Sequence, residues 1–355
     1  MNNLFGLVYE DAITENLPGR VQIRPVTYEM EGIRVAANLY LPADCDETGD
    51  VKYPAVAVAH PNGGCKEQVA GLYTQRLAES GFIALVCDAR YQGESDGESR
   101  LRDYPANRVE DISGMVDYLT LLPMVDARRI GALGICGGGG YTLAAAQTDK
   151  RIKAVATLSM FNSGRVRRNG FLDSAVDTIQ QRLCRSAEAR NEELRGNVQY
   201  EGFLPPNATD DELRAKMAEL PENTLYRDGI EYYGLSHKHP NATGSYTTAS
   251  FMKLMAFDVE DRMGLIDQPL LMIAGEKADT LYMTQDAFNK ATGTDDKTII
   301  PFNTPMGSGN GGTYATIRKL EPNATVLDGL PVEMKQAERG DAQRIEKWLK
   351  EIGQN

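Results

Sequence analysis

Short apolar runs that alternate with helical patterns constrain the fold of this chain more than any other feature. The runs are AVAVAH (55–60), FIALVCDA (82–89), RIGALGI (129–135) and KAVATLSM (153–160). Continuous apolar runs of this length are typical of strands buried on both faces of a parallel sheet. Helical patterns or a glycine-rich turn separate them. The alternation therefore predicts an α/β fold with right-handed crossovers.

Two further patterns divide the chain into a core and an insertion. Residues 20–30 and 33–42 alternate in polarity around Glu31-Gly32, which predicts an N-terminal antiparallel hairpin. The strand–helix alternation stops at Phe161 and resumes with PLLMIAG at 269–275. We therefore interpret 1–161 and 269–355 as one mostly parallel α/β core, and 162–268 as a helical cap insertion. An amphipathic helix around Trp348 is expected near the end of the chain.

Composition argues against several classes of function. The chain has 38 Lys and Arg against 50 Asp and Glu, a net charge of −12. Such a charge repels nucleic-acid phosphates and anionic lipid, so we expect no nucleic-acid partner and no membrane association. The five cysteines are scattered without a C-x-x-C pair, which fits neither a disulfide framework nor a zinc ribbon. A cytoplasmic protein without metal or cofactor is expected. G-x-G-x-x-G at 307–312 lacks the βαβ context of a dinucleotide site.

The strongest candidate for chemistry is Gly134-Ile135-Cys136-Gly137-Gly138, between a predicted strand and a predicted helix. This is the small-x-nucleophile-x-small pattern of a nucleophile elbow, with cysteine in place of the usual serine. The turn would place the Cys136 sulfur at a helix N-terminus, where free N–H groups favour the thiolate. The alternative is a buried structural cysteine in a glycine-rich turn.

A second candidate is the loop His60-Pro61-Asn62-Gly63-Gly64 after the first buried strand. Loops in this position supply a backbone donor to an oxyanion hole. The expected pair of donors is the N–H of Asn62 and that of Gly137. The alternative is a plain turn in which His60 is a structural hydrogen-bonding residue.

Four segments in this order resemble one family: HPNGGCKEQVAGLY, DARYQGESDGE, RVEDISGMVDYL and GICGGGGYTLAAAQTDKRIKAVAT. They are similar to the α/β-hydrolase superfamily, and within it to the dienelactone-hydrolase-like branch that includes polyketide-transferase-type proteins. The resemblance implies a triad in the chain order nucleophile, acid, histidine. It makes Cys136 the nucleophile and Asp279, just after the strand 269–275, the acid. Asp279 could also cap the following helix.

The sequence departs from that family at the histidine, since none follows Asp279. The chain has only His60, His237 and His239. One reading is that His237 or His239 reaches Cys136 from the insertion and acts as the base. The other is that both pack at the surface of the insertion. Their H-x-H spacing is also seen in metal sites, but no nearby acidic cluster completes one.

We therefore expect a hydrolase that acts on a small carboxylic ester, lactone or thioester through Cys136, without the usual histidine. Two alternatives stay open: an impaired scaffold that binds a small acyl compound or a protein partner, and an acyltransferase. The expected ligand is a small acyl molecule, because capped pockets suit small, largely apolar compounds. Folds of this kind often form dimers, so a homodimer is a further expectation.

Overall fold

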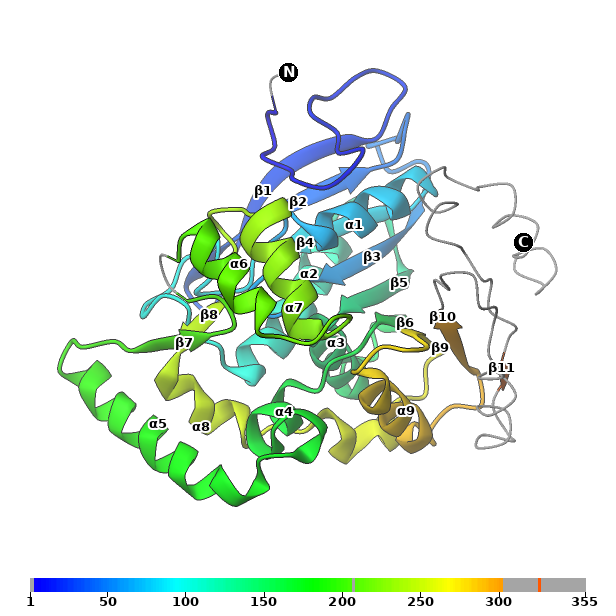
Figure 1. The fold of residues 1–355 in the computed structure, drawn as a ribbon. Helices are drawn as coiled ribbons and strands as arrows, with labels where there is room; N and C mark the ends of the chain where they lie inside the picture. The colour runs from blue at the N-terminus through cyan, green and yellow to red at the C-terminus, as the bar shows by residue number, and fades with distance from the viewer. Residues whose placement is uncertain (1–2, 206–207, 303–324, 327–355) are drawn as a thin grey trace.

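The computed structural model describes residues 3–205, 208–302 and 325–326, and it contains a nine-stranded sheet (Figure 1). The strands lie in the order β1-β2-β4-β3-β5-β6-β9-β10-β11. Only the β1–β2 and β2–β4 pairs are antiparallel. The bounds are β1 (Gln22–Met30), β2 (Ile33–Leu41), β3 (Tyr53–Ala59), β4 (Ile83–Cys87), β5 (Val125–Ile135), β6 (Ile152–Leu158), β9 (Leu270–Gly275), β10 (Lys297–Phe302) and β11 (Thr325–Val326). The predicted mostly parallel α/β sheet is confirmed.

The N-terminal hairpin forms where the alternating pattern predicts it. Met30 pairs with Ile33, so Glu31 and Gly32 form a two-residue turn. Both turn residues have positive φ, 50° at Glu31 and 76° at Gly32. Two central residues with positive φ match the twist of antiparallel strands, and glycine at the second position reduces the strain.

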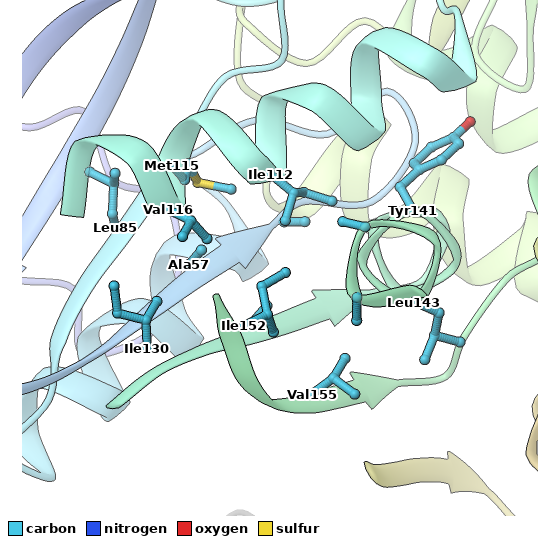
Figure 2. Packing of buried hydrophobic residues seen from close by; sticks show 14 of the residues in the cluster. Ala57, Leu85, Ile112, Met115, Val116, Ile130, Tyr141, Leu143, Ile152 and Val155 are labelled. Atoms are coloured by element: carbon cyan, nitrogen blue, oxygen red, sulfur yellow. The ribbon is translucent and has the colours of Figure 1, made fainter. Parts of the chain in front are cut away.

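Helices cover both faces of the sheet. Helix α1 (Val69–Glu79) packs on one face, and α2 (Pro105–Leu121), α3 (Gly137–Thr148) and α9 (Leu281–Lys290) pack on the other. Figure 2 shows Met115 and Val116 of α2 beside Ala57 of β3, and all three side chains are almost fully buried. Burial of a side chain as large as Val116 contributes about 2 kcal/mol, so this face anchors α2.

The insertion, residues 162–268, lies between β6 and β9 and is mainly helical, with a small antiparallel pair β7–β8 that the sequence pattern did not predict. In Figure 1, α5 reaches away from the sheet. A capping box of Thr209 and Glu212 opens α6. The elements are α4 (Ser163–Asn169), η1 (Phe171–Asp173), η2 (Val176–Thr178), α5 (Ile179–Leu194), β7 (Tyr200–Gly202), α6 (Asp210–Ala218), α7 (Leu225–Gly229), the π-helix η3 (Ile230–Ser236), β8 (Ser245–Thr247), η4 (Thr248–Ser250), α8 (Phe251–Leu254) and η5 (Val259–Leu265).

Two sequence-based expectations concern the end of the chain. The helix around Trp348 and the glycine-rich segment 303–313 both lie outside the described residues. Within the described part of the chain, no helix has the length and apolar character needed to cross a bilayer.

Candidate active site

Cys136 lies at a sharp turn between β5 and α3. Its backbone adopts φ 54° and ψ −121°, a conformation that L-residues rarely adopt. The Cys136 carbonyl accepts hydrogen bonds from the N–H groups of Gly139 and Phe161, both at 2.9 Å, which hold the turn in place. A strained residue between a strand and a helix is the geometry of a nucleophile elbow.

The glycines around Cys136 are required by space. A Cβ at Gly134 would lie 2.5 Å from the Gly138 carbonyl oxygen, and a Cβ at Gly138 would lie 2.4 Å from the Ala59 oxygen. A Cβ at Gly137 would lie 2.3 Å from the Asn62 side chain. Contacts this short essentially never occur, so the turn needs glycine at each position. The steric demand predicted from the motif is met by the structure.

The two predicted oxyanion donors lie beside the Cys136 sulfur. The backbone N–H groups of Gly137 and Asn62 both lie near enough to the sulfur to lower the pKa of Cys136. The Asn62 side chain is held in turn, since its Nδ2 donates to Ser163 Oγ at 2.8 Å. These donors follow β5 and β3, neighbours in the sheet whose crossovers run in opposite directions. Open α/β sheets bind ligands at this kind of switch point, outside the carboxyl ends of the strands.

The Cys136 thiol is harder to ionise than the elbow motif predicts. Burial raises the pKa of Cys136 to about 11, although the Gly137 N–H, the guanidinium groups of Arg167 and Arg108, and the Asn62 N–H all lower it. The Gly137 N–H therefore favours the thiolate as expected, but it does not keep the pKa of Cys136 from rising. Desolvation of the charged form outweighs the combined attraction of the donors and arginines.

Arg108 and Arg167 are site residues that sequence reasoning missed. Arg108 is buried, and its Nη2 donates to the His60 carbonyl at 3.0 Å. Arg167 places its guanidinium 5.2 Å from the centre of the Tyr246 ring, and its buried Nε has no hydrogen-bond partner. The available signal for Arg167 was the group of three arginines at 165, 167 and 168, soon after the fourth strand. These two cations give the site a positive potential toward an anion that forms at Cys136.

Tyr233 also faces this region from the insertion. It belongs to the π-helix η3, a rare geometry that occurs frequently at functional sites. Burial, and then the neighbouring Cys136 sulfur, hold the pKa of Tyr233 well above its usual range. The Tyr233 hydroxyl therefore keeps its proton and stays neutral. No sequence pattern distinguished it from the adjacent Tyr232.

Asp279 follows β9 by four residues, and Cys136 directly follows β5. The two strands are parallel and only β6 lies between them, so both residues belong to the carboxyl-end edge of the sheet. Asp279 Oδ2 accepts the Leu225 N–H at 3.0 Å, at the start of α7 in the insertion. The expectation that Asp279 caps the following helix is therefore wrong, because Thr280 is the N-cap of α9 and Asp279 accepts from the first residue of α7 instead.

All three histidines lie in the described residues, and none hydrogen-bonds Cys136 or Asp279. His60 Nδ1 lies 2.7 Å from the Pro61 oxygen, and its Nε2 accepts the Ala89 N–H at 3.1 Å, so both nitrogens are used. His237 stacks on Tyr232 with ring centres 4.2 Å apart. His239 Nδ1 lies 3.6 Å from the Cys65 sulfur. The structural reading of His60 therefore holds, and the described contacts lend no support to a base from the insertion.

Comparison with known proteins assigns this chain to a family. Residues 31–283 match the family described as X-Pro dipeptidyl-peptidase (S15 family). YcjY of Escherichia coli strain K12 is 38% identical over 74% of this chain and 83% of its own. PA2218 of Pseudomonas aeruginosa is 34% identical over 80% of this chain and 75% of its own. The polyketide transferase claH of Penicillium crustosum is 25% identical over 72% and 80%.

Solved structures agree with this assignment. The crystal structure of PA2218 superposes with a TM-score of 0.71 and 30% identity, and covers 84% of this chain and 91% of its own. The α/β hydrolase GrgF from Penicillium sp. sh18 has a TM-score of 0.62 and 19% identity over 85% and 97%, a likeness of fold. The chain has the α/β-hydrolase fold, with hydrolase and acyltransferase relatives, and it belongs to the X-Pro dipeptidyl-peptidase (S15) family.

Proposed function

We propose that this chain hydrolyses small carboxylic esters, lactones or thioesters, with Cys136 as the nucleophile. The observation that carries the proposal is the pair of backbone N–H groups, of Asn62 and Gly137, that meet at the Cys136 sulfur. A strained cysteine with two convergent donors is the arrangement that acyl transfer needs. The family and the relatives named above favour acyl chemistry as well.

The reaction begins with loss of the Cys136 proton to solvent. The sulfur then attacks the carbonyl carbon, and the carbonyl electron pair moves onto the oxygen. The N–H groups of Asn62 and Gly137 bind this oxyanion, and Arg167 and Arg108 add favourable charge. When the electron pair returns, the bond to the leaving group breaks. The group departs as an alkoxide or thiolate and takes a proton from solvent, and an acyl-Cys136 thioester remains. Water then attacks this thioester and releases the acid.

The second half of the reaction should be the slow one. No imidazole hydrogen-bonds Cys136 in the described residues, so the attacking water has no histidine to take its proton. Loss of the histidine from a triad costs about a millionfold in turnover, or about 8 kcal/mol. An oxyanion hole and substrate binding alone still accelerate the reaction about 10³- to 10⁴-fold over the uncatalysed reaction in water. We therefore expect activated substrates to react and the acyl-enzyme to accumulate.

Nitrophenyl acetate tests this proposal, because its leaving group needs no proton. Wild-type protein should release one equivalent of nitrophenol in a burst, followed by a low steady rate. Mass spectrometry should find the acetyl group on the peptide that contains Cys136. Cys184→Ser is the matched control, since Cys184 is exposed on α5, and it should keep the burst. Cys136→Ala should abolish it. A burst that survives Cys136→Ala would refute the role of this residue.

Two observations favour a second candidate, a scaffold that binds a small acyl compound or a partner without turnover. Asp279 uses its carboxylate on the Leu225 N–H, and burial raises the pKa of the Cys136 thiol. A scaffold would bind an acyl compound in calorimetry and form no covalent adduct. An acyltransferase would instead form the adduct and pass the acyl group to an added thiol or alcohol faster than to water. The nature of the product thus separates the three functions.

A further inference from the structure

A second cluster of reactive side chains, which does not include Cys136, lies where the insertion meets the core. Cys65 and Glu67 belong to the segment between β3 and α1, and His239 follows the π-helix η3 in the insertion. One ligand atom from each residue lies within 4.8 Å of the other two. The Cys65 sulfur is 3.6 Å from His239 Nδ1, and Nδ1 is 3.8 Å from Glu67 Oε2. Three different donor types therefore converge on one point.

The Glu67 carboxylate carries an unused, buried oxygen at this point. The Glu67 side chain is 5% exposed, and its Oε2 has no hydrogen-bond partner. Its other oxygen, Oε1, accepts from Lys66 Nζ and from Asn241 Nδ2. A buried carboxylate oxygen without a partner is costly, and native proteins normally satisfy such atoms. Oε2 is the atom that faces His239.

The surrounding charge also favours an additional cation. Lys66 Nζ forms ion pairs with Glu67, Asp88 and Glu94, at 2.5, 2.8 and 2.8 Å. Three carboxylates, two of them buried, thus share one ammonium group. These four side chains together carry an excess of negative charge. A buried excess of negative charge stabilises a cation placed against it.

We propose that Cys65, Glu67 and His239 bind one Zn²⁺ ion and that this ion joins the insertion to the core. Sulfur, imidazole nitrogen and carboxylate oxygen are the ligands that zinc takes. Zinc bonds of about 2.3 Å to sulfur and about 2.0–2.1 Å to nitrogen, at a tetrahedral angle, separate those two atoms by about 3.5 Å. The structure has 3.6 Å. Water takes the fourth position.

The protonation states fit this assignment. His239 Nδ1 accepts the Asn241 N–H at 3.2 Å, so Nδ1 carries the lone pair and the ring proton is on Nε2. Zinc would take that lone pair in place of a long hydrogen bond. The Cys65 thiol loses its proton to solvent when the sulfur–zinc bond forms, so binding releases one proton and weakens as the pH falls.

The ion would stiffen a junction that already has direct contacts. The Gly244 N–H donates to the Gly63 oxygen at 3.2 Å, and Gln68 Nε2 donates to the His237 oxygen at 2.8 Å. Both contacts join the insertion to the segment that begins at Asn62, one of the two oxyanion donors. The proposed site is independent of the nucleophile, so it stands whether or not Cys136 turns over a substrate.

Cadmium titration of chelator-treated, full-length protein tests the site, because cadmium bound to thiolate gives an ultraviolet charge-transfer band. Wild-type protein should bind one equivalent, and zinc should displace it. Cys65→Ser and His239→Ala should each weaken binding by at least about a hundredfold, beyond the 10–100-fold range of supporting residues. His237→Ala, two residues away, is the matched control and should bind normally, as should Cys136→Ser and Cys184→Ser.

Zinc should also raise the midpoint of thermal unfolding of wild-type protein and leave that of Cys65→Ser unchanged. Circular dichroism should confirm that each variant is folded. Absence of a saturable band in the wild-type protein would overturn the proposal without recourse to any variant. A band that persists in Cys65→Ser, or that is lost in Cys136→Ser, would overturn it too, because the metal would then lie elsewhere.

Discussion

The reactivity of Cys136 should increase steeply with pH, well beyond the range of an ordinary thiol. Burial raises the pKa of Cys136 to about 11. Since the thiolate is the nucleophile, the alkylation rate follows the thiolate fraction, which is about 10⁻⁴ at pH 7 and about 10⁻² at pH 9. The rate should therefore increase about a hundredfold between these values. It should increase by almost another tenfold between pH 9 and 10, where a thiol with a pKa of about 8.5 changes by less than about 1.5-fold.

The assay is alkylation by iodoacetamide at a series of pH values, quenched at intervals and quantified on the peptide that contains Cys136. Peptide mapping is needed because Cys184 is exposed and Cys45 is partly exposed, so both also react. Cys184→Ser removes the faster background. Circular dichroism at each pH should show that the protein stays folded.

A rate that levels off below pH 9 would refute this reasoning. It would mean that the N–H groups of Gly137 and Asn62, together with Arg167 and Arg108, outweigh the desolvation of the sulfur. The original prediction of a stabilised thiolate would then be right. An alkylation rate that keeps increasing to pH 10 would mean that desolvation of the sulfur outweighs the N–H groups and the arginines. Ester hydrolysis should then also be faster at alkaline pH.

Three further predictions concern the surroundings of Cys136. Gly137→Ala would drive a Cβ to 2.3 Å from the Asn62 side chain, so the nitrophenyl acetate burst should slow by about 10² to 10³, as on loss of one oxyanion donor. Asp279→Ala should lower the urea-unfolding free energy by about 1 kcal/mol, because the Leu225 N–H loses its cap, and change the burst by less than about tenfold; a far larger loss of activity would show that Asp279 acts in the chemistry. Burial, and then Arg108, lower the pKa of His60 to about 3, so the unfolded chain binds a proton below about pH 6.5 that the folded protein does not. Stability should fall by up to about 1.4 kcal/mol per pH unit from pH 6.5 to 3, and this slope should be shallower in His60→Asn.

The core and the nucleophile turn could be predicted from the sequence because their signals are local. Each buried strand is a continuous apolar run, and the runs at 55–60 and 129–135 became β3 and β5. The elbow needs small residues within two positions of Cys136, and the sequence shows them directly. The positions of Asn62 and Gly137 follow from the same local logic, since each comes just after a strand and neighbouring parallel strands end at one edge of the sheet.

The pKa of Cys136 and the partners of Asp279 and His239 could not be predicted in that way. The helix terminus and its N–H groups are visible in the sequence, but the desolvation that opposes them depends on how the insertion covers the site. The Leu225 N–H meets Asp279 across 54 positions, and His239 meets Cys65 across 174. The periodicity of apolar residues along the sequence gives no information about contacts at such separations.

The same long-range contacts explain why the H-x-H pair carried no metal prediction. No acidic cluster lies near His237 and His239 in the sequence, yet Glu67 lies against His239 in space. The fold also separates the two histidines, because His237 stacks on Tyr232 and His239 turns toward Cys65. The adjacent histidines therefore do not act as a pair. The insertion brings His239 to a cysteine and a carboxylate of the core, and His239 makes no hydrogen bond to Cys136. The missing base at Cys136 and the candidate metal site therefore follow from a single arrangement of the chain.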